Sequence, residues 1–218
     1  MTSKQGKTRR SSARVQQKRE RNRREILAAA EALLQDGGID AVTLAAVAGE
    51  LALTKQALYH YFPSKEALIK ILVVKLLYDE IEALIAAVEK EKSPTRVLGA
   101  MIRAFYAHYI DHLNAFRAVY SASQLYQASS GIIDENMLRE EINPRTRGLF
   151  DIMEERLSKP SMTRKARAGC RRLAYSAWLA ALGLVTMLSI AEANNDPLIH
   201  SDQDLLDSLA EAFDTQSR

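Results

Sequence analysis

A cluster of polar side chains between residues 54 and 61 has the chemistry to contact a nucleic acid. The segment TKQALYHY carries hydroxyl, ammonium, amide and imidazole groups within eight residues. The ammonium of Lys55 can donate to O6 and N7 of guanine, and the amide of Gln56 matches N6 and N7 of adenine. We therefore predict that Lys55 and Gln56, with Thr54 beside them, contact base edges. Five neighbouring residues are predicted to bind phosphates: Thr43, Tyr59, His60, Tyr61 and Lys65.

Two short helices joined by a tight turn are expected to hold these side chains. Thr43 is a suitable N-cap for the first helix, whose apolar residues recur at the spacing of one helix face: Leu44, Val47, Ala48 and Leu51. Thr54 can cap the second helix, and Pro63 cannot continue it. The second helix therefore runs from about residue 54 to 61, and its interior side is small: Ala57, Leu58 and Phe62. This is the composition of a recognition helix in a helix-turn-helix.

The surrounding sequence resembles the DNA-binding domain of the TetR family of bacterial one-component regulators. The resemblance covers about Arg23 to Leu72, through the runs REILAAAEALLQDGG, AVTLAAVAGEL and LTKQALYHYFPSKEALI. Its most specific part is the stretch from Leu58 to Leu68. Ala52 departs from the family, which often has glycine in this turn, so the backbone there must avoid positive φ or accept a small strain. The resemblance implies a dimer and, for the function, repression of transcription.

The composition indicates an all-α protein. The chain has 218 residues, 47% of them hydrophobic and 26% charged, which is enough for one or two domains with a real core. Nine glycines and five prolines leave little room for turns, and alternation of Val, Ile and Thr is absent. Cys170 is the only cysteine, which excludes an internal disulfide. A single thiol suits a reducing cytoplasm, where we expect the protein to act.

Positive charge is concentrated at the amino terminus. Residues 1–24 hold ten Lys or Arg and one acid, Glu20, so they carry a charge of +9. The net charge of the whole chain is only +3. No apolar stretch follows, so this is not a secretory signal, and its Ser, Gln and Arg content predicts disorder. The tail is either simply solubilising or a DNA-backbone contact that raises affinity in a salt-dependent way. In the second interpretation, the residues that contact the DNA backbone are Arg9, Arg10, Arg14, Lys18, Arg19, Arg21, Arg23 and Arg24.

We expect three parts along the chain. They are the basic tail (1–22), a helix-turn-helix DNA-binding domain (23–68) and a helical ligand-binding and dimerisation domain (69–218). The first helix should start near Gln17 and stop at Gly37–Gly38, and a long helix capped by Ser64 should connect the domains and end near Lys92. Further helices are expected at 94–112, 115–128 with Asn114 as its cap, 134–141, 143–159, 163–193 and from 201 or 202 onward.

The last two long helices are expected to form a dimer interface. Small residues in the first of them permit close helix approach, and pairing with a second copy would give an isologous four-helix bundle. Two recognition helices about 34 Å apart could then read a palindrome. Because Leu173 to Ala191 holds nineteen residues without a charge, a membrane anchor is the alternative. Its many Ala, Ser, Gly and Thr residues count against this alternative, and no membrane partner is expected.

Aromatic and Met side chains lie between the connecting helix and the dimer helices. They suggest an apolar pocket between helices for an amphipathic or aromatic ligand, with an ordinary core as the alternative for any single residue. The predicted pocket residues are Tyr106, Tyr109, Phe116, Tyr120, Met153, Tyr175 and Trp178. His108 and His112 have possible metal-ligand spacing, but no metal-binding motif surrounds them, so neither a metal nor a cofactor is expected.

Together these features predict a homodimeric, ligand-responsive transcriptional regulator. Its partners would be a palindromic double-stranded DNA operator and a small-molecule effector, which would shift the helix from Ser64 to Lys92 and release the DNA. An enzyme is not expected, because the sequence offers no phosphate loop, no nucleophile with a base and no suitable carboxylate pair. Two alternatives remain, namely a nonspecific or membrane-associated DNA-binding protein and a helical enzyme. At the level of single residues, the tyrosines could instead pack in the core and Lys65 could be a solvated charge.

Overall fold

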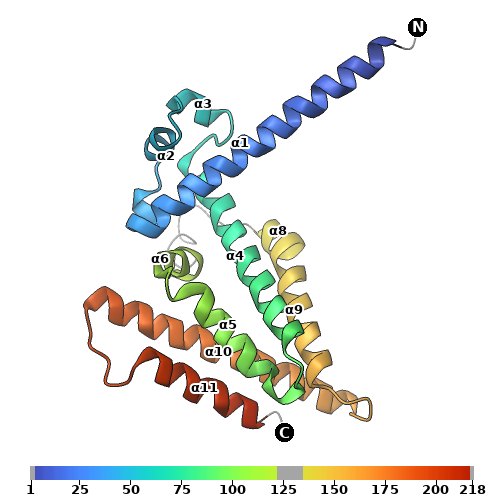
Figure 1. Ribbon diagram of the computed structural model, residues 1–218. Helices are drawn as coiled ribbons and strands as arrows, with labels where there is room; N and C mark the ends of the chain where they lie inside the picture. The colour runs from blue at the N-terminus through green and yellow to red at the C-terminus, as the bar shows by residue number, and fades with distance from the viewer. Residues whose placement is uncertain (1–2, 122–134, 217–218) are drawn as a thin grey trace. The chain divides into compact units, whose positions relative to one another are not determined.

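The computed structural model describes residues 3–121 and 135–216, and every regular element in these ranges is a helix (Figure 1). The predicted all-α fold is confirmed. The chain divides into two compact units, Met1–Val73 and Val74–Arg218. The division falls inside α4 (Lys65–Lys90), beyond residue 68, where we expected the DNA-binding domain to end.

Three helices and the start of α4 build the first unit. They are α1 (Ser3–Ala41), α2 (Leu44–Glu50) and α3 (Lys55–Tyr59), and α2 packs against both of the others (Figure 1). The core that joins them is small and apolar, and its fully buried side chains include Ile26, Ala30, Leu34, Val47, Leu58, Phe62 and Leu68. The short helices α2 and α3 are therefore held by the carboxyl-terminal half of α1 and the first turns of α4.

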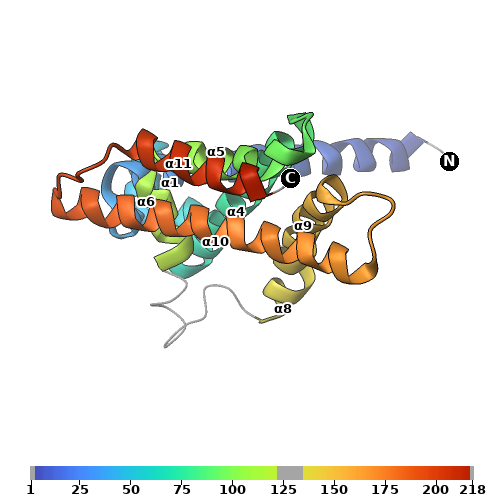
Figure 2. The ribbon, with the colours of Figure 1, turned by 90° about the horizontal axis from the view of Figure 1, so that it is seen from below.

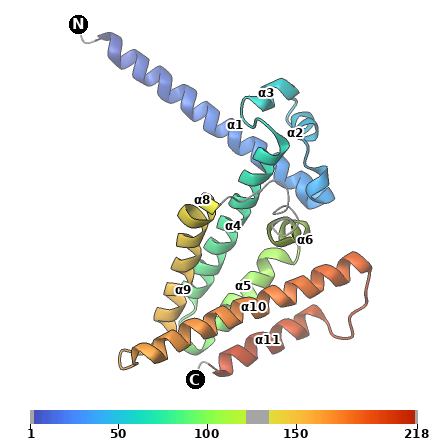
Figure 3. The ribbon, with the colours of Figure 1, turned by 180° about the vertical axis from the view of Figure 1, so that it is seen from behind.

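The helix α1 extends further toward the amino terminus than expected. We predicted disorder over residues 1–22 and a helix beginning near Gln17, whereas the structure is helical from Ser3 (Figures 1 and 3). Arg, Lys, Gln and Ala favour helix, and a helix already anchored at Ile26 can lengthen without a new nucleation step. At the other end Gly38 has a φ of 71° and interrupts the helix at the predicted stop.

The turn between α2 and α3 contains a residue in the left-handed conformation. Ala52 has a φ of 51°. The N–H of Leu53 donates to the carbonyl of Ala48 at 2.9 Å, and the N–H of Ala52 donates to the carbonyl of Gly49 at 3.1 Å. These are the two hydrogen bonds of a Schellman motif, which requires a left-handed residue. Of the two possibilities left open by the sequence, Ala52 takes the strained one, at a cost of about 1–2 kcal/mol.

Replacing Ala52 with glycine should raise the free energy of unfolding of the protein by about 0.5–1 kcal/mol. Glycine removes the contact between Cβ and the backbone but loses more entropy on folding, so the gain is smaller than the strain. Urea unfolding followed by circular dichroism would measure it. Ala32→Gly, at an exposed position inside α1, is the matched control and should cost about 1 kcal/mol. Equal losses from both substitutions would mean that residue 52 is not strained.

The second unit contains the rest of α4 and two sets of helices on either side of residues 122–134. Before that segment come a 3₁₀ turn at Pro94–Arg96, α5 (Val97–Tyr109), α6 (Leu113–Phe116) and the π-helical η2 (Arg117–Ser121). After it come α8 (Glu135–Met137), the π-helical η3 (Leu138–Ile142), α9 (Asn143–Leu157), α10 (Arg164–Asn194) and α11 (Asp202–Gln216). Figures 2 and 3 show α10 and α11 side by side, and α5 packs against both.

A glycine allows α5 and α11 to approach closely. The N–H of Gly99 donates to the Asp214 carboxylate at 2.9 Å, and a Cβ at residue 99 would collide with the oxygens of that carboxylate. The same carboxylate lies 3.7 Å from the guanidinium of Arg103. The pairing of these two helices thus depends on the absence of a side chain at residue 99.

One predicted helix differs in its start and its cap. We expected Asn114 to cap a helix from residue 115 to 128, but α6 begins at Leu113 without a side-chain cap. The side-chain oxygen of Asn114 instead accepts a hydrogen bond from the Arg117 guanidinium at 3.0 Å, because that partner lies one turn along the helix. The predicted continuation from residue 122 to residue 128 lies outside the described residues.

Candidate functional site

The short helix α3 and the residues that flank it expose five of the eight side chains that were predicted to contact DNA. The hydroxyl oxygen of Thr54 caps the helix by accepting from the N–H of Ala57 at 3.1 Å. Leu58 and, just after the helix, Phe62 are fully buried and anchor it in the core. Five polar or aromatic side chains of this segment are exposed to solvent: Thr54, Lys55, Gln56, Tyr59 and His60. A partner can therefore reach them without any rearrangement of the core.

Tyr61 connects the end of α3 to α1. Its side chain is half-buried, and its hydroxyl oxygen accepts a hydrogen bond from the side-chain amide of Asn22 at 2.8 Å. The guanidinium of Arg23 lies 5.4 Å from the centre of the Phe62 ring, within the range of a cation–π contact. Because the Tyr61 oxygen accepts from Asn22, its own proton remains available for a phosphate.

The other two predicted phosphate contacts lie at helix starts. The hydroxyl oxygen of Thr43 caps α2 by accepting from the N–H of Ala46 at 3.1 Å. Lys65 is the first residue of α4, where Ser64 accepts from the N–H of Ala67 at 3.1 Å. Both Thr43 and Lys65 are half-buried. Amides at a helix N-terminus favour anions, so Lys65 has a suitable position for a phosphate.

The predicted pocket residues fall into two aromatic groups in the second unit. In the first, Tyr109 packs edge-on against Phe105 and Phe116, with ring centres 5.3 Å apart in each pair, and Tyr120 lies 6.1 Å from Tyr109. Both Tyr109 and Phe116 are buried. These residues come from α5, α6 and η2, so the fold brings together three of the predicted positions.

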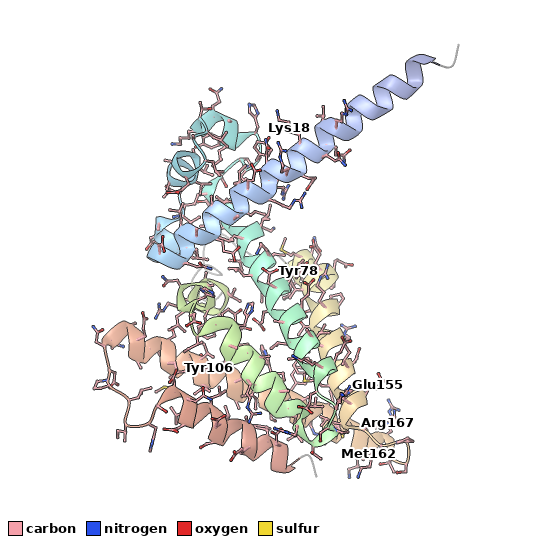
Figure 4. All side chains as sticks on the ribbon, viewed as in Figure 1. Lys18, Tyr78, Tyr106, Glu155, Met162 and Arg167 are labelled. Atoms are coloured by element: carbon pink, nitrogen blue, oxygen red, sulfur yellow. The ribbon has the colours of Figure 1, made fainter. Side chains whose placement is uncertain are left out.

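The second group lies between α9 and α10. Tyr175 stacks on Phe150 with ring centres 3.6 Å apart, and Trp178 meets the same ring edge-on at 6.3 Å. Met153 is fully buried on α9. Tyr106, labelled in Figure 4, has a different partner: its hydroxyl donates to the Asp202 carboxylate on α11. Burial, followed by this hydrogen bond, raises the pKa of Tyr106 to about 12.

Sequence reasoning missed the most unusual polar residue of this unit, Glu80. It lies on α4, only 3% of its surface is exposed, and it accepts hydrogen bonds from three neutral donors. The Tyr109 hydroxyl lies 2.6 Å from Oε2, and the Tyr120 hydroxyl lies 2.8 Å from Oε2 and 3.0 Å from Oε1. The Trp178 side chain is the third donor. Glu80 therefore links α4 to both aromatic groups.

Burial dominates the electrostatics of this carboxylate. It raises the pKa of Glu80 above the ordinary value of 4.5, and the hydrogen bonds from Tyr109, Tyr120 and Trp178 oppose the rise. Burial and the neighbouring carboxylate also raise the pKa values of Tyr109 and Tyr120, so both remain protonated donors. A signal was present in the sequence: Glu80 stands at helical spacing between the apolar residues Leu76 and Leu84, which are both buried.

The remaining candidates have structural surroundings. His108 packs edge-on against Tyr109 with ring centres 4.6 Å apart, and His112 is exposed just before α6. Within residues 3–121 and 135–216, no group of three or more His, Cys, Asp or Glu side chains could hold a metal ion. Cys170 is half-buried, 3.9 Å from the sulfur of Met162.

In the described part of the chain, α10 is the one helix long and apolar enough to cross a membrane. Length and composition alone give this result, and a core helix can pass the same test. One face of α10 is buried within the protein through Ala174, Ala177, Ala181, Val185 and Leu188. The helix packs against α5 and α9, so part of its apolar surface belongs to the core of the second unit.

Comparison with known proteins agrees with this architecture. Residues 26–71 match the family described as bacterial regulatory proteins, tetR family. No curated protein sequence matches the chain. A transcriptional regulator of the TetR/AcrR family from Thermobifida fusca is 18% identical, with a TM-score of 0.65 over 90% of this chain and 98% of that one.

Two further solved structures share the fold at lower similarity. The ketosteroid transcriptional regulator KstR2 of Mycobacterium tuberculosis is 16% identical, with a TM-score of 0.54 over 89% of this chain and 94% of that one. FadR from Bacillus subtilis, solved in complex with stearoyl-CoA, is 15% identical, with a TM-score of 0.55 over 87% and 96%. The chain therefore carries the helix-turn-helix domain of the TetR family of bacterial regulatory proteins and shares the fold of TetR-type transcriptional regulators.

Proposed function

We propose that this protein is a transcriptional repressor that binds a palindromic operator as a homodimer and is released by a small molecule. The observation that carries the proposal is the arrangement of α3, in which buried Leu58 and Phe62 hold exposed Lys55 and Gln56 in a helix-turn-helix. Such a helix is short, so one copy contacts few base pairs. A second copy, one helical turn of DNA away, would supply the missing contacts.

The surface of α10 supports the homodimer. Three large apolar side chains on one face of this helix are more than half exposed: Leu179 (57%), Met187 (56%) and Ile190 (51%). Small or polar residues, including Gly183 and Thr186, lie between them on the same face. Large apolar side chains gathered on one exposed helix face are typical of a protein interface, and pairing with the same face of a second copy would cover them.

The aromatic core around Glu80 supports an effector site in the second unit. Apolar and aromatic surroundings with a few polar groups are typical of small-molecule sites. The FadR structure, with its bound stearoyl-CoA, supports the idea that this fold can accommodate a ligand. Because α4 carries Glu80 in one unit and Leu68 in the other, a ligand that displaces Tyr120 or Trp178 from Glu80 would act on a helix that continues into the DNA-binding unit.

The test begins with selection of bound duplexes from a random pool. A palindromic consensus protected at low protein concentration would support the proposal, whereas equal binding to all duplexes would favour a nonspecific DNA-binding protein. Compounds would then be screened for release of the protein from the selected operator. If no compound releases the protein, the proposal that it binds an operator stands, but the proposal that a small molecule releases it is contradicted. Chemical turnover of a compound would favour an enzyme.

Substitutions on α3 should separate base reading from phosphate binding. Lys55→Ala and Gln56→Ala should each reduce discrimination between the selected operator and a mutated one by about 1–3 kcal/mol. Lys65→Ala, at the start of α4, should weaken binding to all duplexes alike and lower the salt dependence by about two phosphate contacts, one for each protomer of the proposed dimer. Fluorescence anisotropy with both duplexes measures these effects. Equal losses on operator and random DNA from every variant would refute the assignment.

A further inference from the structure

The part of α1 from Arg14 to Arg21 is a helix whose side chains lie on the surface of its unit. Every residue from Arg14 to Arg21 is exposed, including Val15 at 66%. From Arg14 onward, the first half-buried residue is Asn22, which contacts Tyr61, and the first fully buried one is Ile26. In Figures 1 and 3 this part of α1 extends away from α2 and α3. A polar helix that buries nothing gains little stability from its own unit, which suggests that a partner covers it.

The chemistry of this segment is almost purely cationic. Residues 14–24 contain six Lys or Arg and a single acid, Glu20. Arg14, Lys18 and Arg21 follow one another at intervals of four and three residues, so they lie on one face of the helix. Figure 4 labels Lys18 on this exposed part of α1. In the sequence, Lys7 and Arg10 continue the same spacing toward the amino terminus.

We propose that the segment of α1 from Lys7 to Arg21 is an arm that binds the phosphate backbone of double-stranded DNA. This rests on the proposed function, since the arm joins the DNA-binding unit next to Tyr61, at the end of α3. Cations spaced along a helix can neutralise successive phosphates and release counterions, without reading the bases. At 1.5 Å per residue the segment is about 20 Å long, which exceeds the reach of α3 alone.

The composition favours DNA over a membrane surface as the partner. Helices that lie in a membrane interface combine basic residues with a broad apolar face. Between Ser3 and Arg24 the only residues with aliphatic side chains are Ala13 and Val15. The arm therefore offers charge without an apolar face.

The test is the triple substitution Arg14→Gln, Lys18→Gln and Arg21→Gln in the full-length protein. Glutamine has a similar helix propensity, and the Arg21–Glu25 ion pair that the substitution removes is exposed, so folding should be unaffected. The matched control removes three exposed cations from the start of α10: Arg164→Gln, Lys165→Gln and Arg167→Gln. Both variants lose the same charge. Circular dichroism and size-exclusion chromatography would establish that they fold and assemble as the wild type does.

Affinity is then measured against salt concentration on the selected operator and on a random duplex. The slope of log K against log salt should fall by about 0.9 for each phosphate that the variant no longer neutralises, or about 5 for two arms of three cations. Base preference should remain unchanged, and the control variant should keep the wild-type slope. An unchanged slope in the arm variant, or an equal fall in the control, would overturn the proposal.

Two further outcomes distinguish DNA binding by the arm from its alternatives. If no palindrome is selected at all, the proposed function fails, but the slope on random duplex still tests the arm. Vesicles of phosphatidylcholine and phosphatidylserine, in a ratio of about three to one, are the competing surface. Arm-dependent binding to these vesicles with an unchanged DNA slope would assign the arm to lipid and contradict the proposal.

Discussion

Replacing Glu80 with alanine should lower the free energy of unfolding by about 2–4 kcal/mol. The substitution removes an acceptor shared by Tyr109, Tyr120 and the Trp178 side chain, and it leaves a small cavity. Tyr109 is fully buried and cannot turn to water, so its hydroxyl would lose its partner outright. Urea unfolding followed by fluorescence measures the effect directly, because Trp178 is the only tryptophan and contacts Glu80.

The control for this experiment is Glu80→Gln, which retains the volume and one carbonyl acceptor. At neutral pH it should cost less than about 1 kcal/mol, because it also removes a buried charge. Equal destabilisation by Gln and Ala would mean that the charge itself is required. Equal stability of both variants and the wild type would mean that the hydrogen bonds contribute nothing to folding.

The stabilities of the wild type and of Glu80→Gln should respond differently to pH. Because burial raises the pKa of Glu80 above 4.5, the folded state keeps this proton at pH values where the unfolded state has released it. The stabilisation is fully present below pH 4.5 and is lost as the pH rises through the raised pKa. The stability of wild type relative to Glu80→Gln should therefore decrease with rising pH. The opposite slope would show that hydrogen bonding to the charged form outweighs burial.

Introducing charge on the exposed face of α10 should convert the proposed dimer to a monomer. Leu179→Glu with Met187→Glu places carboxylates at two side chains that are more than half exposed in the single chain. The fold should survive, since neither residue is in the core, but each interface would bury four like charges. Light scattering should then report the monomer mass. Operator affinity should fall by about 100-fold or more, because the second half-site no longer binds as part of the same complex.

The matched control is Ile199→Glu, at an apolar residue that is 95% exposed and lies between α10 and α11. This variant should remain dimeric and bind the operator as the wild type does. A wild-type protein that is already monomeric would contradict the proposed assembly. A double variant that remains dimeric would place the interface on another surface.

Local signals in the sequence predicted most of the helix boundaries. Thr43, Thr54 and Thr163 each cap the helix that follows them, through hydrogen bonds of 3.1, 3.1 and 3.3 Å. Each cap depends on a side chain and a backbone N–H three residues later, so it can be read from neighbouring residues alone. Asn114 does not cap its helix because its side chain accepts a hydrogen bond from Arg117 instead. The sequence alone does not tell which of these two local contacts is the stronger.

Features that depend on distant contacts were harder to predict. The partners of Glu80 come from α5, η2 and α10, and only the folded chain brings them to α4. Tyr106 has the same residue type as Tyr109, yet one contacts α11 and the other lies in the core. The predicted DNA contacts of α3 could be identified from local sequence, because one short segment carries both the buried anchors and the exposed side chains.

The hydrogen bond between Asn22 and Tyr61 joins α1 to the end of α3 through a single oxygen atom. If a phosphate accepts the hydroxyl proton, the amide, the phenol and the phosphate form one relay in which each hydrogen bond polarises the next. The hydrogen bond from Tyr61 to the phosphate would then be stronger, because Asn22 already donates to the Tyr61 oxygen. In that arrangement, one phenolic oxygen would couple α1 and the segment that follows α3 to the same phosphate of the DNA backbone.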